Sequence, residues 1–173
     1  MCSSDLLFPN VTQLDFTGPL QVLSRIPKAR CHIAAKTPEP VATDCSLALA
    51  PTTSFADCPP LDVICVPGGF GVVGAIEDSE TLSFVRERAL AATYVTSVCT
   101  GAFVLGAAGL LKGKRATTHW AYRDLLPLVG AIRSDERVCR DGALLTGGGV
   151  TAGIDFAFTL VADVPAFVSP DSR

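Results

Sequence analysis

The segment Tyr94–Leu105 constrains the fold more than any other part of the chain. Its first five residues read as a β-branched strand, and the small residues after Cys99 read as the start of a helix. A residue at such a strand-to-helix corner takes a strained backbone conformation, so small residues are required two positions away on either side. Ser97 and Gly101 occupy those positions. The segment therefore predicts a nucleophile elbow, with sulfur in place of the serine hydroxyl.

Cys99 is the residue that we expect to carry covalent chemistry. The helix that follows it offers unpaired N–H groups and the positive end of its dipole, and both favour a thiolate. The other six cysteines read as small apolar residues. They form no C-x-x-C pair and no zinc-like spacing, so we expect no metal site. Seven cysteines behind an amino terminus without a basic, apolar leader favour a reducing cytoplasm with free thiols.

Length and composition favour one globular domain over residues 1–173. Hydrophobic residues make up 49% of the chain, yet the apolar runs are short and interrupted. None approaches the roughly 20 residues that span a bilayer, so we expect no membrane partner. High apolarity without a span is typical of parallel strands that are buried on both faces. The net charge is −3 and the basic residues are scattered, which argues against nucleic acid as a partner.

Candidate strands alternate with candidate helices along the chain, which predicts a doubly wound, mostly parallel α/β sheet of the flavodoxin-like type. We expect strands at 6–8, 31–35, 46–50, 61–66, 94–98 and 116–118, and a hairpin formed by 136–139 and 143–145. We expect helices at 19–26, 78–92, 119–128 and 151–163, with a loop at 11–16 and a frayed tail at 164–173.

The carboxyl ends of parallel strands form the edge at which such sheets bind ligands. Asp15, Gly68, Gly69 and Cys99 all follow candidate strands and are expected at this edge. Beside a thiolate in an apolar cleft, desolvation and like charge raise the pKa of a carboxylic acid, so that Asp15 could donate a proton near neutral pH. The alternative is that Asp15 only caps a turn.

Three further features of this edge leave alternatives open. The backbone N–H groups of Gly68, Gly69 and Thr100 could hold an anionic intermediate, although glycines end many strands without such a role. His119 could act as a base toward the sulfur, or could make a structural hydrogen bond. The run Gly147-Gly148-Gly149 reads first as a site of close packing.

Taken together, these motifs resemble the ThiJ/PfpI superfamily, the cysteine-elbow relatives of class I glutamine amidotransferases. The resemblance runs from Leu6 to Asp163, and six segments carry it: 14–19, 52–63, 66–69, 96–101, 116–120 and 145–149. Many members have glutamate where this chain has Asp15, and the aspartate resembles the branch that hydrates isocyanides.

The resemblance implies a cofactor-independent lyase that adds water to an isocyanide and releases an N-substituted formamide. Cys99 is implied as the nucleophile that forms a thioimidate, and Asp15 as the acid that becomes the base for water. Thr100 is implied to orient Asp15 and the reacting group. No metal or organic cofactor is implied, and a homodimer is expected by analogy.

Two departures from the superfamily pattern concern the ends of the chain. The segment Met1–Asp5 is short and polar for a central strand, and relatives continue with helical residues beyond Asp163. We therefore expect a domain that is incomplete at both termini.

Two other functions compete with the hydratase. One is a sensor domain of an AraC-type transcriptional regulator, which carries a similar elbow but is followed by a helix-turn-helix domain. The other is redox sensing or glyoxalase-type chemistry through Cys99, because an exposed thiol of low pKa oxidises readily.

Overall fold

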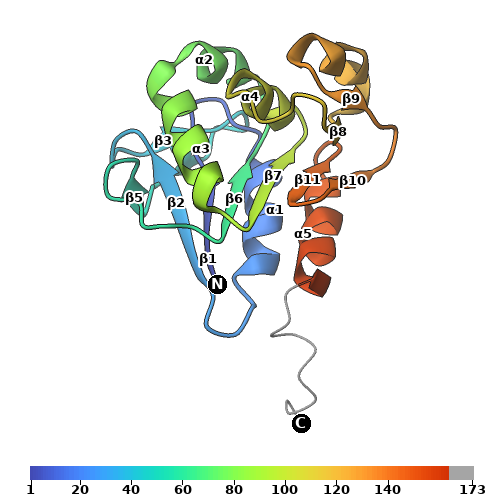
Figure 1. Ribbon diagram of the computed structural model, residues 1–173. Helices are drawn as coiled ribbons and strands as arrows, with labels where there is room; N and C mark the ends of the chain where they lie inside the picture. The colour runs from blue at the N-terminus through green and yellow to red at the C-terminus, as the bar shows by residue number, and fades with distance from the viewer. Residues whose placement is uncertain (164–173) are drawn as a thin grey trace.

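A computed structural model describes residues 1–163 and shows a central sheet between two layers of helices (Figure 1). Seven strands form the sheet in the order β10-β11-β7-β6-β1-β2-β5. They are β1 (Cys2–Leu6), β2 (Arg30–Ala35), β5 (Thr53–Ser54), β6 (Val63–Val66), β7 (Tyr94–Val98), β10 (Val138–Asp141) and β11 (Leu144–Gly147). Neighbouring strands are parallel except β10 and β11, which form an antiparallel hairpin. The doubly wound, mostly parallel sheet is therefore confirmed.

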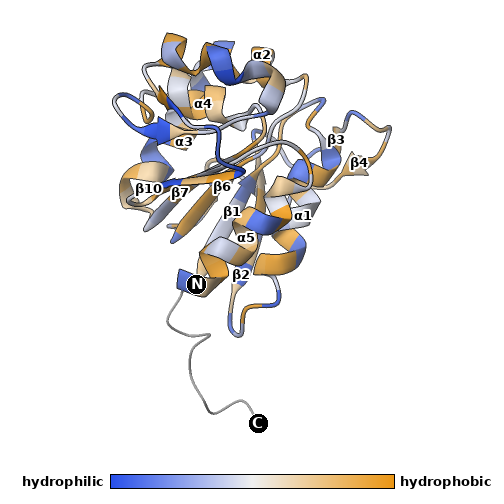
Figure 2. Cartoon of the chain, turned by 90° about the vertical axis from the view of Figure 1, so that its right-hand side faces the viewer, coloured by the Kyte–Doolittle hydropathy of each residue, from blue (hydrophilic) through white to orange (hydrophobic). Residues whose placement is uncertain are grey.

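The two faces of the sheet carry different helices, because alternate side chains of each strand point to opposite faces. Ile64 and Val66 of β6 join the larger core beneath α3 (Ser79–Ala91) and α4 (Gly101–Ala107). Val63 and Cys65 face the second core, with α1 (Gln13–Leu23) and α5 (Ala152–Asp163). Figure 2 shows α1 and α5 packed side by side on this face.

Shorter elements surround the sheet at its carboxyl edge. Helix α2 (Val72–Glu77) precedes α3, strands β3 (Val41–Ala42) and β4 (Ala48–Leu49) pair as a hairpin, and β8 (Arg115–Ala116) pairs with β9 (Ile132–Arg133). The segment expected as a helix at 119–128 is a 3-10 helix, η1 (Trp120–Val129). None of the helices within residues 1–163 is long and apolar enough to cross a membrane.

The amino-terminal strand lies earlier than expected. We expected a strand at 6–8, whereas β1 covers Cys2–Leu6 and pairs with β2 on one side and β6 on the other. The polar segment Met1–Asp5 therefore does form most of a central strand, because backbone ladder bonds do not depend on the side chains. The arrangement costs stability, because the polar side chains of Ser3, Ser4 and Asp5 are buried.

Helix α1 also begins earlier than expected. The segment 11–16 was expected as a loop, but the helix starts at Gln13 and contains Pro19 in its interior. Proline there gives up one backbone hydrogen bond, and the helix tolerates the loss because Pro19 packs against Gly153 of α5. Asp15 thus belongs to the first turn of a helix. The expected tail at 164–173 lies outside the described residues.

Candidate functional site

The elbow at Cys99 has the strained geometry that its sequence predicts. Strand β7 ends at Val98 and α4 begins at Gly101, and between them Cys99 has a φ of 56°. Positive φ is uncommon for a residue other than glycine and persists only where the surroundings hold it. Here the Cys99 N–H donates to the Gly148 carbonyl at 2.7 Å, and the Thr118 hydroxyl donates to the Cys99 carbonyl at 2.6 Å. Backbone and side-chain bonds therefore fix the direction of the thiol.

Asp15 is held beside this thiol by two backbone donors from distant parts of the chain. Its side chain is 0% exposed. The Gly68 N–H donates to Oδ2 at 3.2 Å and the Val150 N–H donates to Oδ1 at 3.0 Å. Burial raises the pKa of Asp15 to about 6, against the opposing effect of hydrogen bonds from the Cys99 thiol and these two N–H groups. The carboxyl group can therefore both accept and donate a proton near neutral pH.

The thiolate that the helix start predicts is not the resting form of Cys99. Burial, and then the negative charge of Asp15, raise the pKa of the Cys99 thiol to about 12. The Thr100 N–H and hydroxyl act in the opposite direction with less effect. Cys99 is 7% exposed and α4 has only seven residues, so desolvation outweighs the helix dipole. These surroundings favour the thiol form of Cys99 over the thiolate.

Gly68, Gly69 and Thr100 complete the site, but the N–H groups of the two glycines already have partners. The Gly68 N–H holds Asp15, and the Gly69 N–H donates to the Thr100 hydroxyl oxygen at 3.0 Å. A Cβ on Gly68 would lie 2.6 Å from the Thr100 nitrogen and 2.8 Å from the Cys99 Cβ. Only glycine therefore lets the loop after β6 approach the elbow so closely.

His119 stands apart from the thiol and the carboxylate. Its Nδ1 accepts a hydrogen bond from the Ala121 N–H at 3.3 Å, which caps η1. Its ring packs so closely on Gly149 that a Cβ there would clash with it. Among residues 1–163, its hydrogen bonds include none to Cys99 or Asp15. The structure thus supports the structural role of His119 that the sequence left open.

Two residues of the site were not among the candidate site residues, although Thr118 lies in one of the segments that carry the family resemblance. Val150 contributes only its backbone N–H to Asp15, and it does so with a φ of 48°. Thr118 contributes the hydroxyl that binds the Cys99 carbonyl. The run Gly147-Gly148-Gly149 was the available hint, because it brings the chain past the elbow and lets the next residue turn back toward Asp15.

Known proteins resemble this chain over most of its length. The family model described as the DJ-1/PfpI family matches residues 6–163. An isonitrile hydratase of Pseudomonas putida is 62% identical over 159 residues, which cover 92% of this chain and 70% of that protein. The HTH-type transcriptional regulator CdhR of Pseudomonas aeruginosa is 26% identical over 166 residues, which cover 91% of this chain and 48% of the regulator.

A solved protein structure is also similar to this chain. A ThiJ/PfpI family protein from Pseudomonas syringae superposes with a TM-score of 0.92 and 45% sequence identity. The match covers 94% of this chain and 68% of that one.

Proposed function

This chain belongs to the DJ-1/PfpI family, and on that premise we propose that it is an isonitrile hydratase, an enzyme that adds water to an isocyanide and yields an N-substituted formamide. The observation that carries the proposal is the pairing of Asp15 with the elbow thiol. Two backbone N–H groups hold the carboxyl group beside Cys99, and its pKa is about 6. The 62% identity to the Pseudomonas putida enzyme supports the same reaction.

The first half of the reaction adds the thiol across the isocyanide carbon. Asp15 takes the proton of Cys99 as the sulfur forms a bond to the terminal carbon of R–N≡C. The protonated Asp15 then gives that proton to the same carbon, which leaves a thioimidate, R–N=CH–S, on Cys99. Because burial and the charge of Asp15 raise the pKa of the thiol, we place this proton transfer at the moment when the carbon–sulfur bond forms.

The second half releases the product by addition of water. The Asp15 carboxylate takes a proton from water as the hydroxyl oxygen bonds to the thioimidate carbon, and it passes this proton to the nitrogen. Asp15 then accepts the proton of the new hydroxyl group as the carbon–sulfur bond breaks. The N-substituted formamide leaves, and the proton returns from Asp15 to the sulfur. One water is consumed and the site regains its starting state.

The other members of the site position these two groups. The Gly68 N–H orients Asp15, and the Gly69 N–H orients the Thr100 hydroxyl, which lowers the pKa of the Cys99 thiol. The Thr100 N–H also donates toward the sulfur and stabilises the negative charge that develops there. In this scheme Gly68 and Gly69 are positioning residues, and Thr100 touches the reacting atom.

The two competing functions are less favoured. The regulator CdhR shares 26% of residues with this chain, far below the 62% shared with the hydratase. Redox sensing requires thiolate character and access to oxidants. At Cys99, burial limits the access of oxidants, and burial together with the charge of Asp15 disfavours the thiolate.

The homodimer that the family resemblance implies stays part of this proposal. Light scattering coupled to size-exclusion chromatography measures the mass directly. A mass near 36 kDa, about twice the 18.0 kDa of the chain, is expected.

Formation of N-phenylformamide from phenyl isocyanide tests the proposed function. We expect turnover by the wild type and by Cys65→Ala, and loss of turnover in Cys99→Ala. Cys65 is a matched control because it is a buried cysteine in β6, outside the elbow. Absence of formamide from folded wild-type protein would contradict the proposal, as would full activity of Cys99→Ala.

A further inference from the structure

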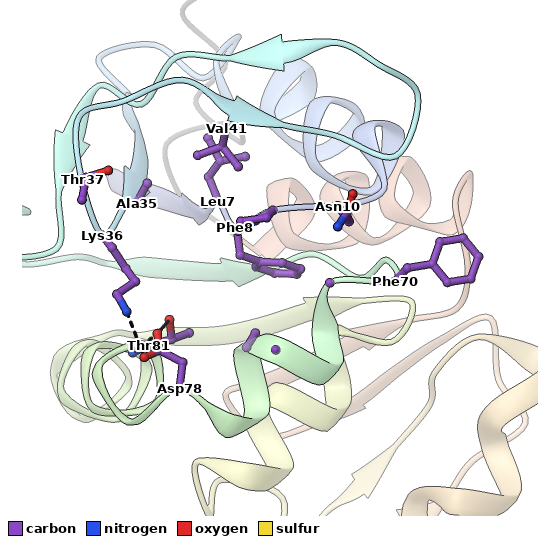
Figure 3. A pocket seen from close by; sticks show the side chains of 14 residues that line it. Leu7, Phe8, Asn10, Ala35, Lys36, Thr37, Val41, Phe70, Asp78 and Thr81 are labelled. Carbon is purple, nitrogen blue, oxygen red and sulfur yellow. Dashed lines mark hydrogen bonds and ion pairs between the residues drawn. The ribbon is translucent and has the colours of Figure 1, made fainter.

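Two cavities flank the exposed side chain of Phe70, one on each side of α2. The smaller has a volume of about 370 Å³ and lies between α2, α4 and η1. The larger, of about 670 Å³, lies between α2, the β3 region and the carboxyl ends of β1 and β2 (Figure 3). Both sizes are in the range of small-molecule sites. The question is which of them receives the R group of a substrate that reacts at Cys99.

The smaller cavity begins at the catalytic elbow. Gly69 and Thr100 form part of its wall. A Cβ on Gly68 would lie 2.7 Å from the Thr100 hydroxyl oxygen and 2.8 Å from the Cys99 Cβ, so Thr100 lies beside the nucleophile and also lines the cavity. This cavity therefore lies next to the position at which a substrate would meet the sulfur, with Thr100 between them.

The walls of the smaller cavity are apolar. Its lining includes Val73, Phe103, Tyr122 and Leu125, and it contains no charged side chain. Apolar walls favour a neutral apolar group and disfavour a charged one, which would lose its hydration without a partner. A cavity of about 150 Å³ already holds a benzene ring. The 370 Å³ here therefore admits a ring with further substituents.

The larger cavity does not meet these conditions. Its lining includes none of the five residues of the candidate site, Asp15, Gly68, Gly69, Cys99 and Thr100. One end is occupied by the ion pair of Lys36 Nζ with Asp78 Oδ1 at 3.0 Å, which Figure 3 shows opposite the end at Phe70. None of these site residues opens into it, and one end carries the charged side chains of Lys36 and Asp78, which the smaller cavity lacks.

We propose that the cavity between α2, α4 and η1 is the subsite for the R group, and that Val73, Phe103 and Tyr122 limit its size and polarity. This inference rests on the proposed function. It assigns to the enzyme isocyanides that carry a neutral ring or a branched hydrocarbon, and it assigns α2 as the wall that selects among them.

Adjacent positions on α2 give a matched pair of variants. Val73 lines the smaller cavity and Gly74 lines the larger one, and both are exposed. Tryptophan at position 73 fills the proposed subsite, whereas tryptophan at position 74 fills the other cavity. The experiment measures kcat/KM for phenyl isocyanide and methyl isocyanide with wild type, Val73→Trp and Gly74→Trp, because methyl isocyanide has no R group large enough to enter either cavity.

We expect Val73→Trp to lower the phenyl-to-methyl ratio of kcat/KM by about tenfold or more, the usual scale of selection by an apolar pocket. Gly74→Trp should keep the wild-type ratio. The subsite is wrong if wild type turns over both substrates and Val73→Trp keeps the wild-type ratio, or if only Gly74→Trp lowers it. Absence of turnover of both substrates by folded wild type would overturn the proposed function itself, and the subsite with it.

Discussion

Asp5 and Asp15 are both completely buried aspartates, yet their surroundings differ in one respect that decides their roles. Asp15 lies at the carboxyl edge of the sheet, where two backbone N–H groups and a thiol bind its oxygens. Asp5 lies in the middle of the central strand β1, directly opposite Cys65 in the strand register. The Cys65 thiol lowers the pKa of Asp5 slightly, but within residues 1–163 no backbone N–H donates to either of its oxygens.

The difference teaches that burial alone does not make a catalytic carboxylate. Burial raises the pKa of Asp5 to about 7 and that of Asp15 to about 6. At Asp15 the hydrogen bonds oppose the effect of burial, because they stabilise the charged form that takes the thiol proton. At Asp5 the same shift serves no proton transfer and appears only as a cost in stability.

Removing Asp5 should give the largest change in stability. Its folded-state pKa of about 7 lies above the unfolded value of 3.8, so between these pH values the folded state keeps a proton that the unfolded state releases. The free energy of unfolding therefore falls as pH rises through this window, by about 4 kcal/mol in all. Urea unfolding should show that Asp5→Val gains about this much more over wild type at pH 8 than at pH 4. An equal gain at both pH values would contradict the assignment.

Moving the Gly68 N–H group that donates to Asp15 should lower the hydration activity. In Gly68→Ala the new Cβ meets the Thr100 nitrogen and the Cys99 Cβ, so the loop that orients Asp15 must move. Misplacement on this scale costs about a hundredfold in kcat/KM. Gly74→Ala is the control, because its Cβ enters open space. Steady-state hydration of phenyl isocyanide measures both, and a Gly68→Ala enzyme as active as the control would remove Gly68 from the positioning scheme.

The pH dependence of activity should separate the two aspartates. The mechanism requires ionised Asp15, whose pKa is about 6. We expect kcat/KM to rise about tenfold per pH unit below this value and to level off above it. Asp5→Val should keep the same profile over pH 5 to 8. A midpoint that moves in this variant would instead couple Asp5 to the reaction.

Replacing Ser4, a buried polar residue of β1, should give the smallest change in stability. Its hydroxyl is buried and has no hydrogen-bond partner within the described chain. Ser4→Ala removes this unpaired group, so the free energy of unfolding should increase by about 1 kcal/mol with activity unchanged. Chemical denaturation measures the free energy of unfolding, and a turnover assay measures the activity. A lower free energy of unfolding in Ser4→Ala would show that the hydroxyl has a hydrogen-bond partner.

The sequence predicts the elbow and the sheet because both depend on local patterns. The strand Tyr94–Val98 was expected with the bounds that the structure shows, and Asp15 and Cys99 meet because the carboxyl ends of parallel strands share one edge. The hairpin around Asp141-Gly142 was likewise predicted from its turn residues.

Other features depend on tertiary context that no local pattern records. Strand β1 was placed too late because Ser3, Ser4 and Asp5 have the side chains of a loop, while their backbone fills a gap between two strands. Val150 acts through its N–H alone, so its residue type carries no signal. The high pKa of Cys99 follows from burial and a nearby charge, which outweigh the helix start visible in the sequence.

The most direct measurement compares Asp15→Asn with Asp5→Asn in the hydration of phenyl isocyanide. Both variants replace a buried carboxyl group with an amide of the same shape. We predict that Asp15→Asn lowers kcat/KM by about 10²- to 10⁴-fold, the usual contribution of a general acid and base, and that Asp5→Asn keeps wild-type turnover. Comparable activity in the two variants would contradict the central claim that the donors around Asp15 make it the proton-transfer group of this enzyme.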